Sequence, residues 1–143
     1  MLTSATARTT AAHDVRPGRA RALCAAGGAA AAVLAWLVEV PLLGIHLSFQ
    51  FGAGQVQTIS APQAAGVALA AGLLGWLLLA VLERRTVRAS RYWVAIALVA
   101  LAASLALPLV AATTTSAIIG LIVMHLAVGI AVIPPLALTA RPK

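Results

Sequence analysis

Glu-Arg-Arg-Thr-Val-Arg-Ala-Ser-Arg, residues 83–91, is the stretch of sequence that decides the fold. It carries four of the ten Lys and Arg residues of the 143-residue chain and lies between two long apolar runs. Charged side chains at this density cannot lie in hydrocarbon, so the stretch marks a membrane surface. Because cytoplasmic loops carry the excess of Lys and Arg, we expect a cytoplasmic turn at the midpoint of a membrane protein.

The composition excludes a water-soluble domain. Hydrophobic residues make up 62% of the chain and charged residues 9%, whereas an average soluble chain has about 25% charged residues. The length leaves room for one domain. The sequence therefore predicts a multi-pass integral protein of the cell (plasma) membrane.

Four apolar segments are long enough to cross a bilayer as helices. They cover residues 22–43, 62–82, 92–112 and 117–138. At about 1.5 Å per residue, each spans roughly 32 Å, and the hydrocarbon core of a bilayer is about 30 Å thick. We expect an all-α membrane protein, a four-transmembrane-helix bundle that forms one domain over residues 22–138.

The remaining segments complete the predicted topology. Residues 1–21 are expected to form a disordered basic tail, with Pro17-Gly18 as a helix breaker, and residues 139–143 a second basic tail. All ten Lys and Arg residues lie in these tails or in the central stretch. This distribution predicts that both termini are cytoplasmic.

The segment between the first two spans, residues 44–61, contains no Lys, Arg, Asp or Glu. Apolar and polar side chains alternate from Ile45 to Phe51, and Gly52-Ala53-Gly54 follows. This pattern predicts a short β-hairpin, which we expect on the extracellular side.

The net charge of +7 does not indicate nucleic-acid binding, because the basic residues flank apolar segments and no groove-reading element accompanies them. We expect them to anchor the protein to anionic lipids of the inner membrane face, at about 1 kcal/mol for each arginine. Tyr92 and Trp93 begin the third span, as interfacial aromatic anchors do. The predicted anchoring residues are Arg19, Arg21, Arg84, Arg85, Arg88, Arg91, Tyr92 and Trp93.

The second span carries small residues at helical spacing. Overlapping pairs four residues apart are formed by Ala68, Ala71, Gly72 and Gly75. Small residues at this spacing allow a neighbouring helix to approach closely, so we predict a central, tightly packed second helix. Alanine that merely faces lipid is the alternative interpretation.

Glu39 and His125 are the only Asp, Glu, His, Lys or Arg residues within the predicted spans. Counting from the outer ends of their helices, Glu39 lies about 6 Å deep, His125 about 14 Å and Ser104 about 12 Å. We therefore predict an intramembrane polar cluster of these three residues in the outer half of the bundle. The cluster is either a structural contact that fixes helix register or a proton-linked or ligand-binding site.

No pattern in the sequence indicates catalysis, a metal or a cofactor. The three histidines lie far apart and Cys24 is the single cysteine, so neither supplies metal-ligand spacing. Phosphate-binding loops, nucleophile elbows and paired catalytic carboxylates are lacking. We predict no catalytic residue, no metal and no cofactor, and the balance is against an enzyme.

The sequence is similar to the small, uncharacterised four-helix membrane proteins of actinobacteria. The resemblance extends from Ala22 to Arg141. It is carried by WLVEVPLLGIHL (36–47), FQFG (49–52), LERR (82–85), MHLA (124–127) and Ile133-Pro134. It implies the same topology and source, and no established activity comes with it.

The predicted function is therefore that of a non-enzymatic interaction or accessory subunit of the plasma membrane. The expected partners are anionic lipids and another membrane protein or a second copy of the chain. The predicted hairpin offers an edge to which a partner can add a strand. The alternatives are a small transporter or proton-coupled component that uses Glu39 and His125 and, third, a membrane enzyme.

Overall fold

The structure is a computed structural model that describes residues 17–141. Within this range, four helices are long and apolar enough to cross a membrane. The elements in chain order are α1 (Pro17–Leu37), η1 (Val38–Leu42), β1 (Ser48–Phe49), β2 (Gln57–Thr58), α2 (Ala61–Arg85), α3 (Ala89–Ala111) and α4 (Thr115–Leu138).

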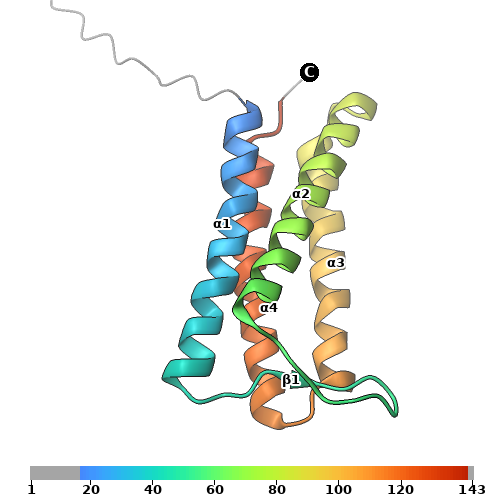
Figure 1. Cartoon of the computed structure of the whole chain (residues 1–143). Coiled ribbons are helices and arrows are strands. Elements are labelled where there is room, and N and C mark those ends of the chain that lie inside the picture. The colour runs from blue at the N-terminus through green and yellow to red at the C-terminus, as the bar shows by residue number, and fades with distance from the viewer. Residues whose placement is uncertain (1–16, 142–143) are drawn as a thin grey trace, which may run out of the picture.

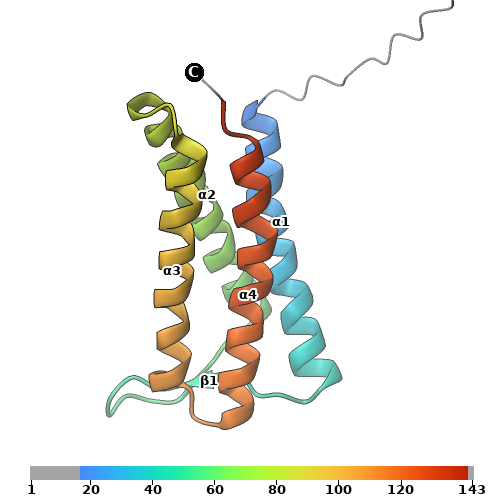
Figure 2. The same cartoon turned by 180° about the vertical axis from the view of Figure 1, so that it is seen from behind.

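The four long helices run up and down in turn (Figures 1 and 2). The start of α1, the turn between α2 and α3 and the end of the described chain lie together at one end of the bundle. We call this the arginine end, because it holds Arg19, Arg21, Arg84, Arg85, Arg88, Arg91 and Arg141. The opposite hairpin end holds residues 43–60 and the turn between α3 and α4.

The helices are longer than predicted at the arginine end. The expected tail of residues 1–21 is wrong for residues 17–21, which form the start of α1. Proline in the first turn of a helix sacrifices no hydrogen bond, so Pro17 begins the helix instead of breaking it. Residues 1–16, with His13 and Asp14, and residues 142–143 lie outside the described range.

The first span ends in a widened turn, the π-helical segment η1. Pro41 has no N–H to donate, and its ring crowds the carbonyl of the preceding turn. The backbone responds with a bond over five residues, from Leu43 N–H to Val38 O at 3.0 Å. The widened turn carries Glu39, which is buried.

The connection at the hairpin end links all four helices. β1 and β2 pair antiparallel, with Ser48 opposite Thr58. β1 and the residue after it also contact the end of α3 and the α3–α4 turn: Gln50 N–H donates to Ala111 O at 2.8 Å, and Thr113 N–H donates to Ser48 O at 3.2 Å. The hydroxyls of Ser48 and Thr113 lie 2.6 Å apart. The two helical hairpins, α1–α2 and α3–α4, are thereby joined at this end.

The core depends on close contact of α1 with α2 and α4. A Cβ atom added to Gly72 would lie 2.9 Å from Ala25 Cα, so the α1 and α2 backbones are in contact there. Of the four small residues singled out in the second span, Ala68, Gly72 and Gly75 are buried and Ala71 is exposed. Only glycine fits the approach at residue 72, because any side chain would push the two helices apart.

Candidate functional site

A groove with a volume of about 660 Å³ lies between α2, α3 and α4. It exists because α2 lies mainly against α1 while α3 lies mainly against α4, so that α2 and α3 make few contacts with each other. Its walls are formed by α2 from Gln63 to Leu78, α3 from Trp93 to Ala111 and α4 from Leu121 to Ile133. Small side chains, among them Ala71 and Ala100, leave its width unfilled.

The groove is open along the side where α2 and α3 face each other. Val67, Leu74, Ile96 and Leu107 line it and are each more than 40% exposed. At the hairpin end, Phe49 and Phe51 line its floor, and their rings stack edge to face with centroids 5.4 Å apart. The result is an elongated apolar slot that extends over most of the length of the helices.

Trp93 closes the other end of the groove and is not the surface anchor that the sequence predicts. Its ring is only 4% exposed, and its indole N–H donates to Ile133 O at 3.2 Å. The ring packs over Gly75, where an added Cβ would lie 2.7 Å from it. Gly75 of α2 has no side chain and so leaves room for the Trp93 ring inside the bundle, while the neighbouring Tyr92 is exposed.

Ser104 and His125 share the groove and are among its few polar residues. The Ser104 hydroxyl donates to Leu101 O at 2.7 Å. Nδ1 of His125 lies 2.6 Å from Leu121 O. Both side chains are therefore held by carbonyls of their own helices.

Glu39, the third member of the predicted polar cluster, lies elsewhere. It is 4% exposed, and its carboxyl lies against Gly120, where an added Cβ would be 3.3 Å from Glu39 Oε2. Neither carboxyl oxygen has a hydrogen-bond partner among the described residues. Gly120 and His125 are five residues apart, which turns them about 140° from each other on α4. The structure thus brings Ser104 and His125 to one groove and places Glu39 on another side of α4.

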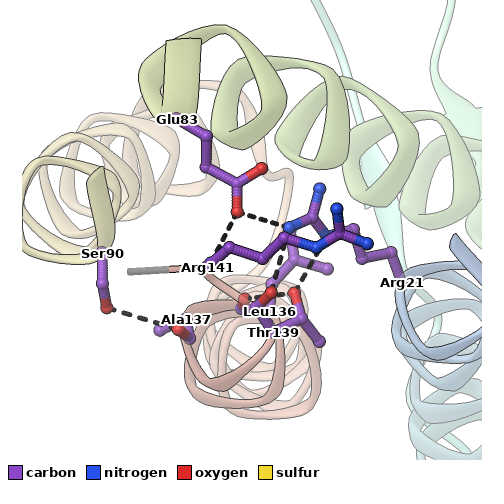
Figure 3. A network of polar contacts seen from close by, with 7 residues as sticks. All are labelled: Arg21, Glu83, Ser90, Leu136, Ala137, Thr139 and Arg141. Carbon is purple, nitrogen blue, oxygen red and sulfur yellow. Dashed lines mark hydrogen bonds and ion pairs between the residues drawn. The ribbon is translucent and has the colours of Figure 1, made fainter. Parts of the chain in front are cut away.

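A second polar site, at the arginine end, was missed by the sequence reasoning (Figure 3). Arg21 Nη2 donates to Glu83 Oε1 at 2.5 Å, and Arg21 Nε donates to Thr139 Oγ1 at 3.1 Å. The backbone N–H of Arg141 also donates to Glu83 Oε1, at 2.9 Å. Because Arg21 is only 6% exposed, it fastens α1 to α2 and to the end of the chain instead of facing lipid headgroups.

One signal in the sequence pointed to this ion pair. Glu83 is the only acidic residue in the basic stretch at residues 83–91, and a carboxylate there has arginines as its natural partners. Because Glu83 and Arg21 are 62 residues apart in the sequence, the sequence alone did not identify Arg21 as the partner. The other arginines at this end that were predicted as anchors are exposed: Arg19, Arg84, Arg85, Arg88 and Arg91.

The described residues offer no metal site, and the apolar groove is their main cavity. Among residues 17–141, His, Cys, Asp and Glu form no group of three that could hold a metal ion. Cys24 is a free thiol in α1. The groove, by contrast, can take up a slender apolar molecule and offers it two polar contacts.

Comparisons with known proteins bear on the family alone. No curated protein and no solved structure matches the chain. A family model matches residues 13–142, in agreement with the resemblance to uncharacterised proteins, while the actinobacterial source stays a prediction. The chain belongs to a family of unknown function, DUF6069.

Proposed function

We propose that the protein is a non-enzymatic, multi-pass protein of the plasma membrane that binds a lipid by holding one hydrocarbon chain in the groove between α2, α3 and α4. The observation that carries this proposal is the shape of the groove. Its volume of about 660 Å³ falls within the range of about 300–1,000 Å³ that is usual for small-molecule sites.

The length and the lining of the groove favour a hydrocarbon chain. On α3 the groove extends from Trp93 to Ala111, about 27 Å at 1.5 Å per residue. Apart from Gln63, Ser104, His125 and the Trp93 indole, the side chains that line it are apolar. A single extended chain is the occupant that suits a slot of this length and polarity.

The arginine end is proposed to face the cytoplasm. It carries the Arg residues of the described chain, while residues 43–60 and 112–116 at the hairpin end contain no Lys or Arg. Cytoplasmic loops are the ones enriched in Lys and Arg, and the exposed arginines would meet anionic headgroups there. A proton-coupled carrier built on Glu39 and His125 is not favoured, because the two residues face different sides of α4.

Filling the groove tests the lipid proposal. Ala71 and Ala100 line the groove, whereas their near neighbours Ala70 and Ala102 are exposed and do not. Purified in mild detergent, the protein should carry a lipid visible by native mass spectrometry. We expect Ala71→Phe or Ala100→Phe to lower the lipid-bound fraction about fivefold or more.

The controls for this experiment are Ala70→Phe and Ala102→Phe, which add the same ring to the same helices outside the groove. Both should retain the lipid at the level of the natural protein. Equal retention in all four variants, or a natural protein without lipid, would overturn the proposal.

Orientation is tested by thiol labelling in intact cells. In a Cys24→Ser background, Gly54→Cys at the hairpin end should react with a membrane-impermeant maleimide. Arg88→Cys at the arginine end should react only after the membrane is opened. Labelling of both positions from outside would refute the proposed topology.

A further inference from the structure

We infer that the lipid held in the groove is a neutral lipid alcohol, a long hydrocarbon whose polar group is a hydroxyl that donates its one hydrogen bond to His125 or to Ser104. This inference rests on the proposed function and names the chemical class of its ligand. It follows from the hydrogen-bonding capacity that the polar groups of the groove have left over.

The groove has few polar groups to offer. Gln63, Ser104 and His125 are the polar side chains that line it, apart from the indole of Trp93. The indole N–H is already donated to Ile133 O. Gln63 lies in the first turn of α2, at the hairpin end of the groove. Inside the groove, recognition therefore depends on Ser104 and His125.

In its neutral form, His125 presents an acceptor to the groove. A carbonyl oxygen can only accept, so the 2.6 Å contact with Leu121 O requires the proton on Nδ1. In the neutral imidazole with that tautomer, Nε2 carries the lone pair. No hydrogen bond to Nε2 occurs among the described residues.

Ser104 presents an acceptor as well. Its single O–H proton is donated to Leu101 O at 2.7 Å, which leaves the oxygen lone pairs as its remaining capacity. A ligand without a hydrogen-bond donor would leave both acceptors unpaired in an apolar slot. A carboxylate or a phosphate, which only accepts, would be repelled by them. A hydroxyl supplies the donor that they lack.

The two acceptors lie at similar depth. A Cβ added to Gly129 of α4 would lie 2.9 Å from Leu101 Cδ2 of α3, which fixes the register of these two antiparallel helices. From that contact, Ser104 is three residues toward the hairpin end on α3 and His125 four residues toward it on α4. These offsets are about 4.5 and 6 Å. A hydroxyl group at this level of the groove therefore lies at about the depth of both side chains.

The depth also orients the ligand. Ser104 is seven residues from the end of α3 at Ala111, so the hydroxyl lies about 10 Å inside that end. From Ser104 to Trp93 the groove continues for eleven residues, about 16 Å along α3. The hydrocarbon chain runs in this direction, and its far part lies against the Trp93 indole.

Fluorescence of Trp93 gives a direct test. Trp36→Phe and Trp76→Phe together leave Trp93 as the single tryptophan of the chain. In phosphatidylcholine vesicles, 9,10-dibromooctadecanol should quench it at about tenfold lower mole fraction than the corresponding methyl ether. The ether has the same chain and bromines and lacks the donor. The anionic acid with the same brominated chain should be no better than the ether.

Variants distinguish the inference from the proposal beneath it. With His125→Phe and Ser104→Ala combined, the alcohol should lose its advantage over the ether; retained helical circular dichroism confirms folding. Equal quenching by alcohol and ether in the starting protein, or a preference for the acid, overturns the lipid alcohol and leaves the hydrocarbon groove standing. If none of the three probes quenches more than it does in the Ala71→Phe variant, the groove binds no chain and the proposed function fails too.

Should the combined variant not fold, native mass spectrometry of the natural protein with an equimolar mixture of alcohol and ether measures the same preference. An excess of bound alcohol of about tenfold supports the inference, and equal amounts overturn it.

Discussion

The two faces of α2 differ sharply although they use the same kinds of residue. Gly72 faces α1 so closely that an added Cβ would lie 2.9 Å from Ala25 Cα. Ala71, its neighbour in sequence, is exposed and lines the groove. On one face, a small residue lets two backbones meet; on the other, it leaves space that a ligand can fill. Small residues in a membrane helix therefore report close packing only on the side where another helix lies.

The packed face is also the face that carries the ion pair. Glu83 in the last turn of α2 binds Arg21 of α1, whereas the groove side of α2 has Gln63 as its polar residue. Substitutions on the packed face should consequently change stability, and those on the groove face should change what is bound.

The largest loss of stability should follow Glu83→Ala. It leaves Arg21, which is 6% exposed, without its carboxylate and removes the acceptor of the Arg141 N–H. Removing one partner of a buried ion pair costs about 3–5 kcal/mol, and we expect about 3 kcal/mol at this rim. Reversible unfolding in detergent, followed by circular dichroism, measures it. Glu83→Gln, which keeps an acceptor, should lose less; an equal loss would show that the charge is irrelevant.

Gly72→Val should come next, with a loss of about 2 kcal/mol. The added methyl groups meet backbone atoms of Ala25, which can give way only if α1 and α2 separate. Gly66→Val is the matched control on the same helix, because a Cβ there meets nothing within 4 Å. Similar stability of the two variants in detergent unfolding would remove the distinction between the two faces.

Glu39→Met should leave the free energy of unfolding unchanged or raise it by up to about 1 kcal/mol. Both carboxyl oxygens are buried without a partner among the described residues, and Met fills a similar volume without a polar group. Glu39→Gln, which stays polar, should not share any gain. A loss above about 1 kcal/mol in the Met variant would mean that the carboxyl has a favourable partner in the membrane.

The smallest change of stability is expected for Ala71→Phe, below about 0.5 kcal/mol, because the ring enters open space in the groove. The same variant should lose its bound lipid. If Ala71→Phe destabilised the protein as much as Gly72→Val in the same unfolding measurement, protein side chains would already fill the groove. The contrast between the two faces of α2 would then be wrong.

Much of the fold could be predicted from the sequence, because hydrophobic length and arginine placement act locally. Four long apolar helices occur where the apolar runs lie. At the arginine end, α1 and α3 start a few residues earlier than predicted, and α2 ends a few residues later. Arginines near a membrane surface can remain helical, so a charge alone does not end a helix.

The candidate site was harder to predict from the sequence, because it depends on which faces of different helices meet. Ser104 and His125 could be placed at similar depth from residue counting, and they do share a groove. Glu39 was expected beside them from the same counting, but depth says nothing of rotation about α4. The buried Trp93 and the Arg21–Glu83 ion pair likewise depend on partners that are distant in sequence.

The backbone bonds from β1 to the α3–α4 turn have a consequence for exchange. These hydrogen bonds join the helices at the hairpin end, and the short turn at residues 86–88 joins α2 to α3 at the arginine end. A molecule held as proposed therefore enters and leaves the groove only sideways, from within the bilayer. Its occupancy then follows its mole fraction among the membrane lipids and is independent of how much of it dissolves in water. Bound as proposed, the lipid would make the state of the protein depend on the composition of the leaflet interior and not on that of either aqueous side.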